Sequence, residues 1–204
     1  SHRRIIEDRD DPDTSASTQY IQIYKTASDN TMSWYCLDAS TPSLMESDVA
    51  IPLNVWQHYA FVWGSSSRRK MYVNGVIQNE SYGESGAVDN ADATDSWDSG
   101  TQKLDICGSA YDDPQRWLGN VADVRVYNTA LDVTDIQILA SKINTDSSLG
   151  AGTTNLMGWW KLNNGSVTDS GPSGGSFVTY NGTLTGTTPD YDAFSVNVQD
   201  NTTT

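Results

Sequence analysis

The sequence predicts an all-β protein, an antiparallel β-sandwich that carries one short helix. Three observations lead to this prediction. Short segments of alternating apolar and polar residues recur along the chain, and most are rich in β-branched and aromatic residues. Turn-forming residues separate these segments. Helical periodicity is confined to one place, and many short strands with almost no helix are typical of two antiparallel sheets packed face to face.

The first pair of strands is predicted at residues 20–25 and 31–37, joined by the turn signal Ser-Asp-Asn at 28–30. Residues 1–18 are polar and highly charged, and we expect a charged N-terminal segment that ends in a loop. The chain begins without Met, so we also expect this start to be truncated. Residues 40–54 are expected to be loop, with room for one short strand.

The strongest strand signals lie in the middle of the chain, at 56–63 (WQHYAFVW) and 69–75 (RKMYVNG). A Gly-Ser-rich turn joins them into a hairpin, and Asn74-Gly75 is a second turn signal. Residues 83–100 are expected to form a long acidic loop before the next strand at 103–109.

One stretch changes its period in the middle. From Val121 to Tyr127 apolar and polar residues alternate, which predicts a strand. Asp132 can then cap a helix in which Val133, Ile136, Leu139 and Ala140 recur at helical spacing. We therefore expect a strand, a tight connection and two or three helical turns that pack against the edge or end of a sheet.

Two further strands are predicted at 156–162 and 177–186, and polar residues dominate the chain after them. The expected organisation is a sandwich at 19–144, followed by a hairpin within 145–191 that completes this sandwich or starts a second repeat. Residues 192–204 are expected to be a polar tail.

The charge of the chain excludes several classes of partner. Its 26 acidic and 12 basic residues give a net charge of −14, which argues against nucleic-acid binding through a basic face and against attraction to anionic membranes. No apolar run reaches membrane-spanning length, so we expect no membrane insertion. All but four acidic residues are Asp, which suits loops between strands, a solvated acidic surface, or oxygen-rich cation sites.

The two cysteines, Cys36 and Cys107, both fall in predicted strands. Buried free thiols are the first interpretation, and a disulfide between them stays open because spacing alone does not decide it. No second cysteine or histidine lies near either one in sequence, which argues against a zinc site.

Several segments together resemble the laminin-G-like domains of the concanavalin A-like lectin and glucanase superfamily. WQHYAFVW and RKMYVNGVIQ are similar to the central hairpin of that family, and ICGSAYDDPQRWLGNVADVRVYNTALDVTDIQIL to its next block. LMGWWKLNNGSVTDSGPSGGSFVTYNGTLTG resembles its opening hairpin. The resemblance covers residues 56–186 and implies a jelly-roll sandwich of two curved antiparallel sheets.

The order of these segments departs from the family, because the opening hairpin comes last. A permuted domain, the start of a second repeat, or missing upstream strands would each explain this, and we favour upstream strands that are not included in the chain. Residues 156–186 would then supply strands to the same domain or to a neighbour.

Catalysis is not expected. Glycoside hydrolases of this superfamily carry two carboxylates on one strand, in a Glu-x-Asp-x-Glu pattern that this chain lacks. The pair Glu80 and Glu84 lies in a predicted loop, and His58, in a strand beside Trp56, reads as a structural histidine.

The loop AYDDPQRWLG is the candidate for a metal site. Asp112, Asp113 and Gln115 offer the carboxylate and amide oxygens that Ca²⁺ binds. The loop also resembles the calcium loop of pentraxins, which implies Ca²⁺ held by these three residues, with further ligands from an upstream loop, a role that Asp10, Asp11 and Asp13 can fill. An ordinary acidic turn set by Pro114 is the alternative.

Two functions are compatible with these features. The first is a non-catalytic binding module that recognises glycans or surface proteins, outside the cell, on a cell surface or on a virion. Trp97, Tyr111 and Trp117 are its candidate sugar platforms, because they lie in or near acidic loops. The second is a structural or decoration protein of a virion or surface layer that has no small ligand. Such a protein would assemble as a homo-oligomer or with neighbouring repeats by strand exchange.

Overall fold

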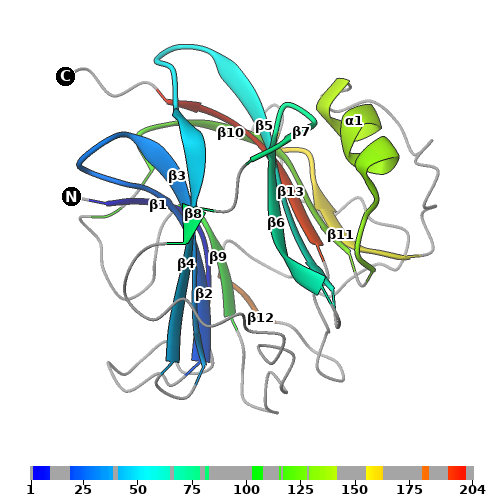
Figure 1. Ribbon diagram of the computed structural model, residues 1–204. Helices are drawn as coiled ribbons and strands as arrows, with labels where there is room; N and C mark the ends of the chain where they lie inside the picture. Colours follow the sequence, from blue (N-terminus) through cyan, green and yellow to red (C-terminus); the bar gives the residue numbers. More distant parts are fainter. Residues whose placement is uncertain are drawn as a thin grey trace.

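The computed structural model contains two antiparallel β-sheets packed face to face, with one helix outside them (Figure 1). This confirms the predicted all-β sandwich with a single short helix among the described residues. The structure describes residues 2–9, 19–38, 41–64, 67–78, 81–82, 103–107, 115, 117–127, 129–141, 155–162, 181–183 and 193–200.

The larger sheet has seven strands in the order β12-β9-β1-β2-β3-β4-β8. Their bounds are β1 Arg3–Arg9, β2 Gln19–Lys25, β3 Thr31–Asp38, β4 Thr41–Ala50, β8 Ser81–Tyr82, β9 Lys103–Ile106 and β12 Asn181–Thr183. All pairs in it are antiparallel.

The smaller sheet has six strands in the order β11-β10-β13-β5-β6-β7. Their bounds are β5 Trp56–Gly64, β6 Ser67–Val73, β7 Val76–Ile77, β10 Gly119–Tyr127, β11 Leu156–Trp160 and β13 Ala193–Asp200. Because the chain crosses between the sheets several times, strands distant in sequence become neighbours.

The main core fills the space between the two sheets. Ile21, Ile23 and Trp34 contribute from the seven-stranded sheet, and Tyr59 and Phe61 face them from the six-stranded sheet. The rings of Trp34 and Phe61 meet edge to face, with centroids 5.6 Å apart. Alternation along each strand sends every second side chain into this layer, so the remaining side chains define two outer faces.

The predicted hairpins of the central strands are confirmed. β2 pairs with β3 and β5 with β6 in antiparallel register. Asn30 adopts the left-handed conformation in the first turn, with φ 62°. Asn74 and Gly75 do the same between β6 and β7, with φ 51° and 79°. Asn and Gly tolerate this region best, which is why both turns are readable from sequence.

The prediction that the sandwich begins at residue 19, after a charged segment at 1–18, is wrong. β1 lies between β9 and β2 inside the larger sheet. The register shifts between Arg4 and Ile6, so Ile5 and Ile6 both reach the core. This bulge breaks the alternation that would have identified the strand. Residues 40–54, expected as loop with room for one short strand, contain the ten-residue strand β4, which buries Met45.

The polar tail predicted at 192–204 is also wrong, because β13 pairs with both β10 and β5 in the middle of the six-stranded sheet. Val196 faces the core, whereas Ser195 lies buried on the outer face. A strand that carries polar residues, such as the buried Ser195, has the composition of a tail, and the sequence pattern alone does not separate the two.

The hairpin predicted within 145–191 is wrong, because its two strands join different sheets. β11 pairs with β10 at the edge of the six-stranded sheet, and β12 pairs with β9 at the edge of the seven-stranded sheet. They extend the same sandwich, as one of the two alternatives anticipated, and do not pair with each other.

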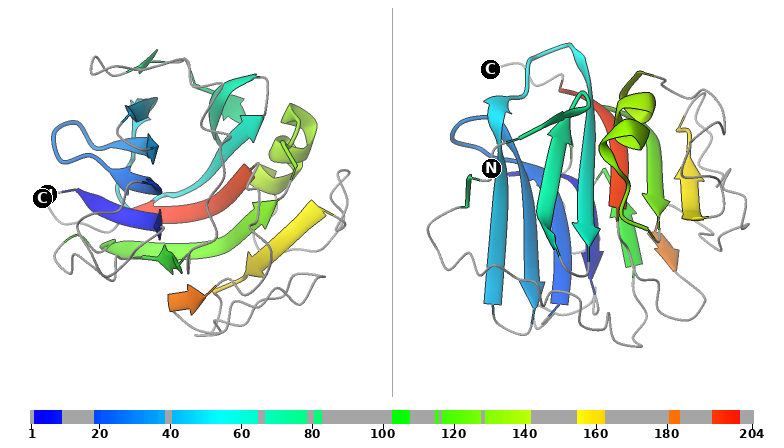
Figure 2. Two further views of the ribbon diagram at one scale, coloured as in Figure 1. Left: turned by 90° about the horizontal axis from the view of Figure 1, so that it is seen from below. Right: turned by 45° about the vertical axis from the view of Figure 1, so that its right-hand side comes forward.

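The helix α1, Val133–Ser141, begins where the sequence indicates. The carboxylate of Asp132 accepts a hydrogen bond of 2.9 Å from the backbone N–H of Asp135, as an N-cap does. Ile136 and Leu139 then pack on the outer face of the six-stranded sheet. The expected position at a sheet edge is therefore wrong: α1 covers a face, on the side away from β1–β4 (Figure 2).

Both cysteines are free thiols. Cys36 lies on β3 and Cys107 directly follows β9, so β1 and β2 separate their strands. Three strand spacings of about 4.8 Å exceed the reach of a disulfide. Within the described ranges, the helix is too short to cross a membrane.

Candidate functional site

Most of the residues predicted to bind metal or sugar lie outside the described residues. These are Trp97, Tyr111, Asp112 and Asp113. Gln115 is described and is half-buried. Among the described residues, no group of three His, Cys, Asp or Glu side chains is close enough to hold a metal ion.

The two ends of the 108–116 loop are well defined. The N–H of Cys107 donates to the carbonyl of Ile5 at 2.7 Å, and the N–H of Trp117 donates to the carbonyl of Cys107 at 3.3 Å. The side chain of Trp117 packs in the core and is only 6 % exposed. The prediction that Trp117 is a sugar platform is therefore wrong, because its ring instead anchors the base of the loop.

The outer face of the seven-stranded sheet carries hydrogen-bonding side chains where its inner face is apolar. Strand register places Asp105, Glu7, Gln22 and Tyr35 side by side in one row across β9, β1, β2 and β3. A second row, Arg4, Tyr24, Ser33 and Glu46, runs across β1, β2, β3 and β4. We call these two rows the polar face.

Glu7 accepts side-chain hydrogen bonds from two other residues of the polar face. Its carboxylate accepts a hydrogen bond of 2.6 Å from the amide of Gln22 and one of 3.2 Å from the guanidinium of Arg4. Glu7 is only 1 % exposed. The bond from Gln22 joins β2 to β1, and the bond from Arg4 lies within β1, so both hold Glu7 as an acceptor.

The polar face becomes accessible towards β3 and β4. Tyr35 and Glu46 are half-buried there, as is Leu44, which pairs with Tyr35 across the two strands. The hydroxyl of Ser33 donates to the carboxylate of Glu46 at 3.1 Å. An aromatic ring beside a carboxylate and an amide is the combination that proteins use to stack on a sugar and bind its hydroxyls.

The residues of the polar face are not among the predicted site residues, although the sequence carries a signal for them. In YIQIYK, Tyr20, Gln22 and Tyr24 alternate with two isoleucines, so one side of that strand is rich in aromatic and amide groups. The predicted ligand-binding aromatics lie in or near loops, because aromatic residues in strands are more often core or sheet-face residues.

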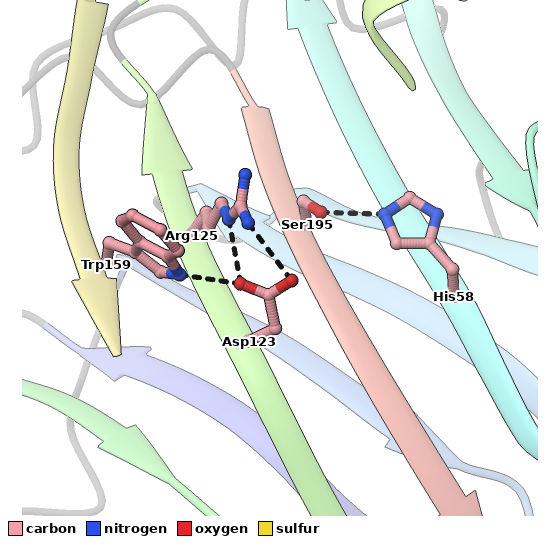
Figure 3. Close-up of polar contacts among 5 residues, drawn as sticks. All are labelled: His58, Asp123, Arg125, Trp159 and Ser195. Carbon is pink, nitrogen blue, oxygen red and sulfur yellow. Dashed lines mark hydrogen bonds and ion pairs between the residues drawn. The ribbon is translucent and has the colours of Figure 1, made fainter. Parts of the chain in front are cut away.

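The outer face of the six-stranded sheet holds a second polar cluster (Figure 3). His58 on β5 lies 2.7 Å from the hydroxyl of Ser195 on β13, measured from its Nε2 atom. Nδ1 of His58 is buried without a hydrogen-bond partner. Burial, with a smaller contribution from the positive charge of Arg125, lowers the pKa of His58 to about 3. His58 is therefore neutral at physiological pH.

Asp123 organises the other half of this cluster. A bulge in β10 places it in the left-handed region, with φ 56°, and turns its carboxylate to the same side as Arg125. That carboxylate accepts bonds of 2.8 and 3.2 Å from Arg125 and of 2.6 Å from the indole N–H of Trp159. The guanidinium also lies 4.3 Å from the centre of the Trp159 ring.

The cluster in Figure 3 is closed to ligands, because all five side chains are buried. The contact between His58 and Ser195 joins β5 to β13, and the bond from Trp159 to Asp123 joins β11 to β10, so the cluster serves stability. The polar face of the seven-stranded sheet is different, since part of it is accessible.

Comparisons with known proteins agree with this architecture. The family described as Concanavalin A-like lectin/glucanases superfamily matches residues 2–137. This match begins at the N-terminal segment that forms β1, and it ends within α1. No curated protein and no solved structure matches the chain. Because the match covers most of the sequence, the chain belongs to the concanavalin A-like lectin/glucanase superfamily.

Proposed function

We propose that this domain is a non-catalytic binding module that recognises glycans through the polar face of its seven-stranded sheet. Domains of this superfamily often bind carbohydrates. The observation that carries the proposal is the half-buried pair Tyr35 and Glu46. Ser33 donates to Glu46, and Gln22, the strand partner of Tyr35, donates to Glu7. The ring provides a stacking surface, and these hydrogen bonds hold the polar groups beside it in place before a ligand arrives.

The opposed carboxylates Glu7 and Asp105 raise the alternative of a glycoside hydrolase. They are register partners on β1 and β9, and the Cβ atoms of such partners lie roughly 5 Å apart, which leaves their carboxyl groups within reach of one another, as in glycosidases. Two observations favour binding instead. Glu7 is enclosed, with both carboxylate oxygens engaged by Gln22 and Arg4, and Asp105 is also buried. A catalytic carboxylate must reach the scissile bond and exchange a proton with it.

The proposed module uses Ca²⁺ at the 108–116 loop. The support is the loop base, where Cys107 and Trp117 are hydrogen-bonded and Trp117 is fixed in the core. A loop with clamped ends loses less conformational freedom when Asp112, Asp113 and Gln115 gather around a cation. The loop also leaves the larger sheet two residues after Asp105, so it starts beside the polar face.

We assign this module to an extracellular, cell-surface or virion-surface setting, where glycans are displayed. The net charge of −14 suits such a surface. A structural protein of a virion or surface layer is the second candidate, and the exposed apolar side chains described in the next subsection favour it, because they offer a surface for protein contacts.

A glycan array followed by calorimetry tests the proposal. The intact domain is screened with millimolar Ca²⁺ and with EDTA, and the best glycan is titrated into Tyr35→Ala and into Trp56→Ala. Trp56 is an exposed aromatic residue outside the polar face, so it is the matched control. Loss of one stacked ring should weaken binding about tenfold in Tyr35→Ala only. Equal binding by wild type and Tyr35→Ala, or no glycan bound under either condition, would overturn the assignment.

Calcium and catalysis are tested separately. Millimolar Ca²⁺ should raise the melting temperature of the wild type over its value in EDTA, because a ligand held only by the folded state stabilises it. Asp112→Asn with Asp113→Asn should abolish the rise, and Asp48→Asn, a distant exposed carboxylate, should preserve it. Hydrolysis of aryl glycosides that disappears in Glu7→Gln would instead support an enzyme.

A further inference from the structure

Large apolar side chains are exposed at one end of the sandwich. Between 38 and 64 % of each is accessible, where a core side chain shows almost none. Six of them come from only two segments, 49–56 and 76–77. We call this surface the apolar end; it consists of Val49, Leu53, Val55, Trp56, Val76 and Ile77.

Hydrogen bonds bring the two segments together. The amide oxygen of Gln78, which follows β7, accepts from the N–H of Asp48 at 3.2 Å, and this places Val49 beside β7. On the other side, the backbones of His58 and Asn74 are joined, with the N–H of Asn74 donating to the carbonyl of His58 at 2.8 Å. Trp56, at the start of β5, therefore lies next to the turn that leads into Val76.

β7 is the edge strand of the six-stranded sheet, and it is unusual in its exposure. Val76 and Ile77 point to opposite sides of the strand, as consecutive residues do, and yet both are exposed. An ordinary edge strand hides one of its two faces in the core. A short edge strand with two exposed apolar side chains is a site where another chain can add contacts.

The charge around the apolar end indicates which kind of partner chain can bind there. The exposed charged side chains in the described part of the molecule are Asp29, Asp48 and Asp132, and all are acidic. Asp48 precedes Val49, and Asp29 lies in the turn whose Asn30 carbonyl accepts from Ile51. Burial, and after it the negative charge of Asp132, raises the pKa of Tyr72, the strand partner of Ile77, so Asp132 lies near that strand. Asp48 and Asp29 thus lie beside the 49–56 segment of the apolar end, and Asp132 lies near the strand that pairs with β7.

We propose that the apolar end is a docking surface for a partner protein whose contact segment combines apolar side chains with lysine or arginine. A second copy of this chain does not fit, because it would bring the same three aspartates and a net charge of −14 against their equals. A basic partner gains from both features, since its apolar side chains cover the surface and its cations face the rim.

The probes for the test are two synthetic extended peptides that share an alternating apolar core and differ only in their flanks, lysine in one and glutamate in the other. Fluorescence polarisation measures their binding to the intact domain at low and high salt. We expect the lysine-flanked peptide to bind, the glutamate-flanked peptide not to bind, and high salt to weaken the complex. Binding of neither peptide, or equal binding of both, would refute the proposal.

Variants separate the apolar and acidic contributions. Trp56→Ser with Val76→Ser should weaken binding of the lysine-flanked peptide about tenfold. Asp48→Asn should weaken this binding less, and it should reduce the dependence of the binding on salt. Tyr35→Ala on the polar face is the control and should bind as the wild type does. Melting curves verify that each variant folds. Concentration-dependent dimerisation of the wild type that Trp56→Ser with Val76→Ser abolishes would show that a second copy is the occupant, and would overturn the proposal.

Discussion

Protonation of His58 should destabilise the fold at mildly acidic pH. His58 is 1 % exposed, its Nε2 atom contacts the hydroxyl of Ser195, and its Nδ1 atom has no partner. Burial first, and the charge of Arg125 second, lower its pKa from 6.5 to about 3. At mildly acidic pH, His58 therefore binds a proton in the unfolded chain but not in the folded one.

The direction and size of this change in the free energy of unfolding follow from the linkage between protonation and folding. Above pH 6.5 the histidine is neutral in both states and contributes no pH dependence. As the pH falls below that value the unfolded state binds the proton and the folded state does not, so stability is lost at about 1.4 kcal/mol per pH unit. This loss continues down to the folded pKa of about 3. Between pH 7.5 and 4.5, His58 alone should remove between about 2 and 3 kcal/mol.

Urea denaturation of wild type and His58→Gln at pH 7.5, 5.5 and 4.5 measures this effect. Glutamine keeps a hydrogen-bonding group towards Ser195 but does not titrate. At each pH the difference in the free energy of unfolding between the two proteins is taken, so the contributions of the carboxylates that both proteins share cancel. His2 is exposed, so His2→Gln is the matched control and should follow the wild type. Parallel stability curves for wild type and His58→Gln would refute the reasoning, because they would mean that burial does not exclude the proton.

Three further predictions concern stability and reactivity. Asp123→Asn keeps a residue that tolerates positive φ but leaves Arg125 without its buried counter-charge, so urea denaturation should show a loss of about 3 kcal/mol; a loss below 1 kcal/mol would mean that the pair is not isolated from water. Asp132→Ala removes the N-cap of α1 and should cost about 1 kcal/mol in the same assay, whereas Asp132→Ser should restore most of it. An aromatic disulfide reagent at pH 8 should label neither cysteine in the folded protein and both in denaturant, because burial raises the pKa of Cys36 and raises that of Cys107 to about 11; rapid labelling of the native protein would contradict this.

The sequence predicts the fold class and the central strands because their signals are local. The segments at 20–25, 31–37 and 56–63 alternate cleanly, and Asn30 and Asn74 occupy turn positions that few other residues tolerate. The N-cap at Asp132 is local for the same reason. Each of these features depends on residues within a few positions of one another, so a single sequence reveals them.

The missed strands depend on long-range contacts. β1 contains a bulge that sends two consecutive isoleucines inward, and its neighbour β9 is nearly a hundred positions further along the chain. The sequence of β13 looks like a polar tail, because the hydrogen-bond partner of its buried Ser195 is His58 on β5, far away in the sequence. Polar residues that are buried by distant partners look like surface residues in a sequence, and only the tertiary structure distinguishes them.

The two outer faces show why polar side chains on a strand have no single meaning. On the six-stranded sheet, Asp123, Arg125 and Trp159 satisfy one another and are sealed, so replacing any of them should lower stability without a direct effect on a ligand. On the seven-stranded sheet, Glu7 and Gln22 are also buried, but Tyr35, the strand partner of Gln22, and Glu46 remain partly accessible. A rigid base with an accessible margin is the arrangement that binding requires, because the ligand then meets groups that are already ordered. The exposed margin of the polar face, and not its buried centre, is therefore where affinity should be sensitive to substitution at constant stability.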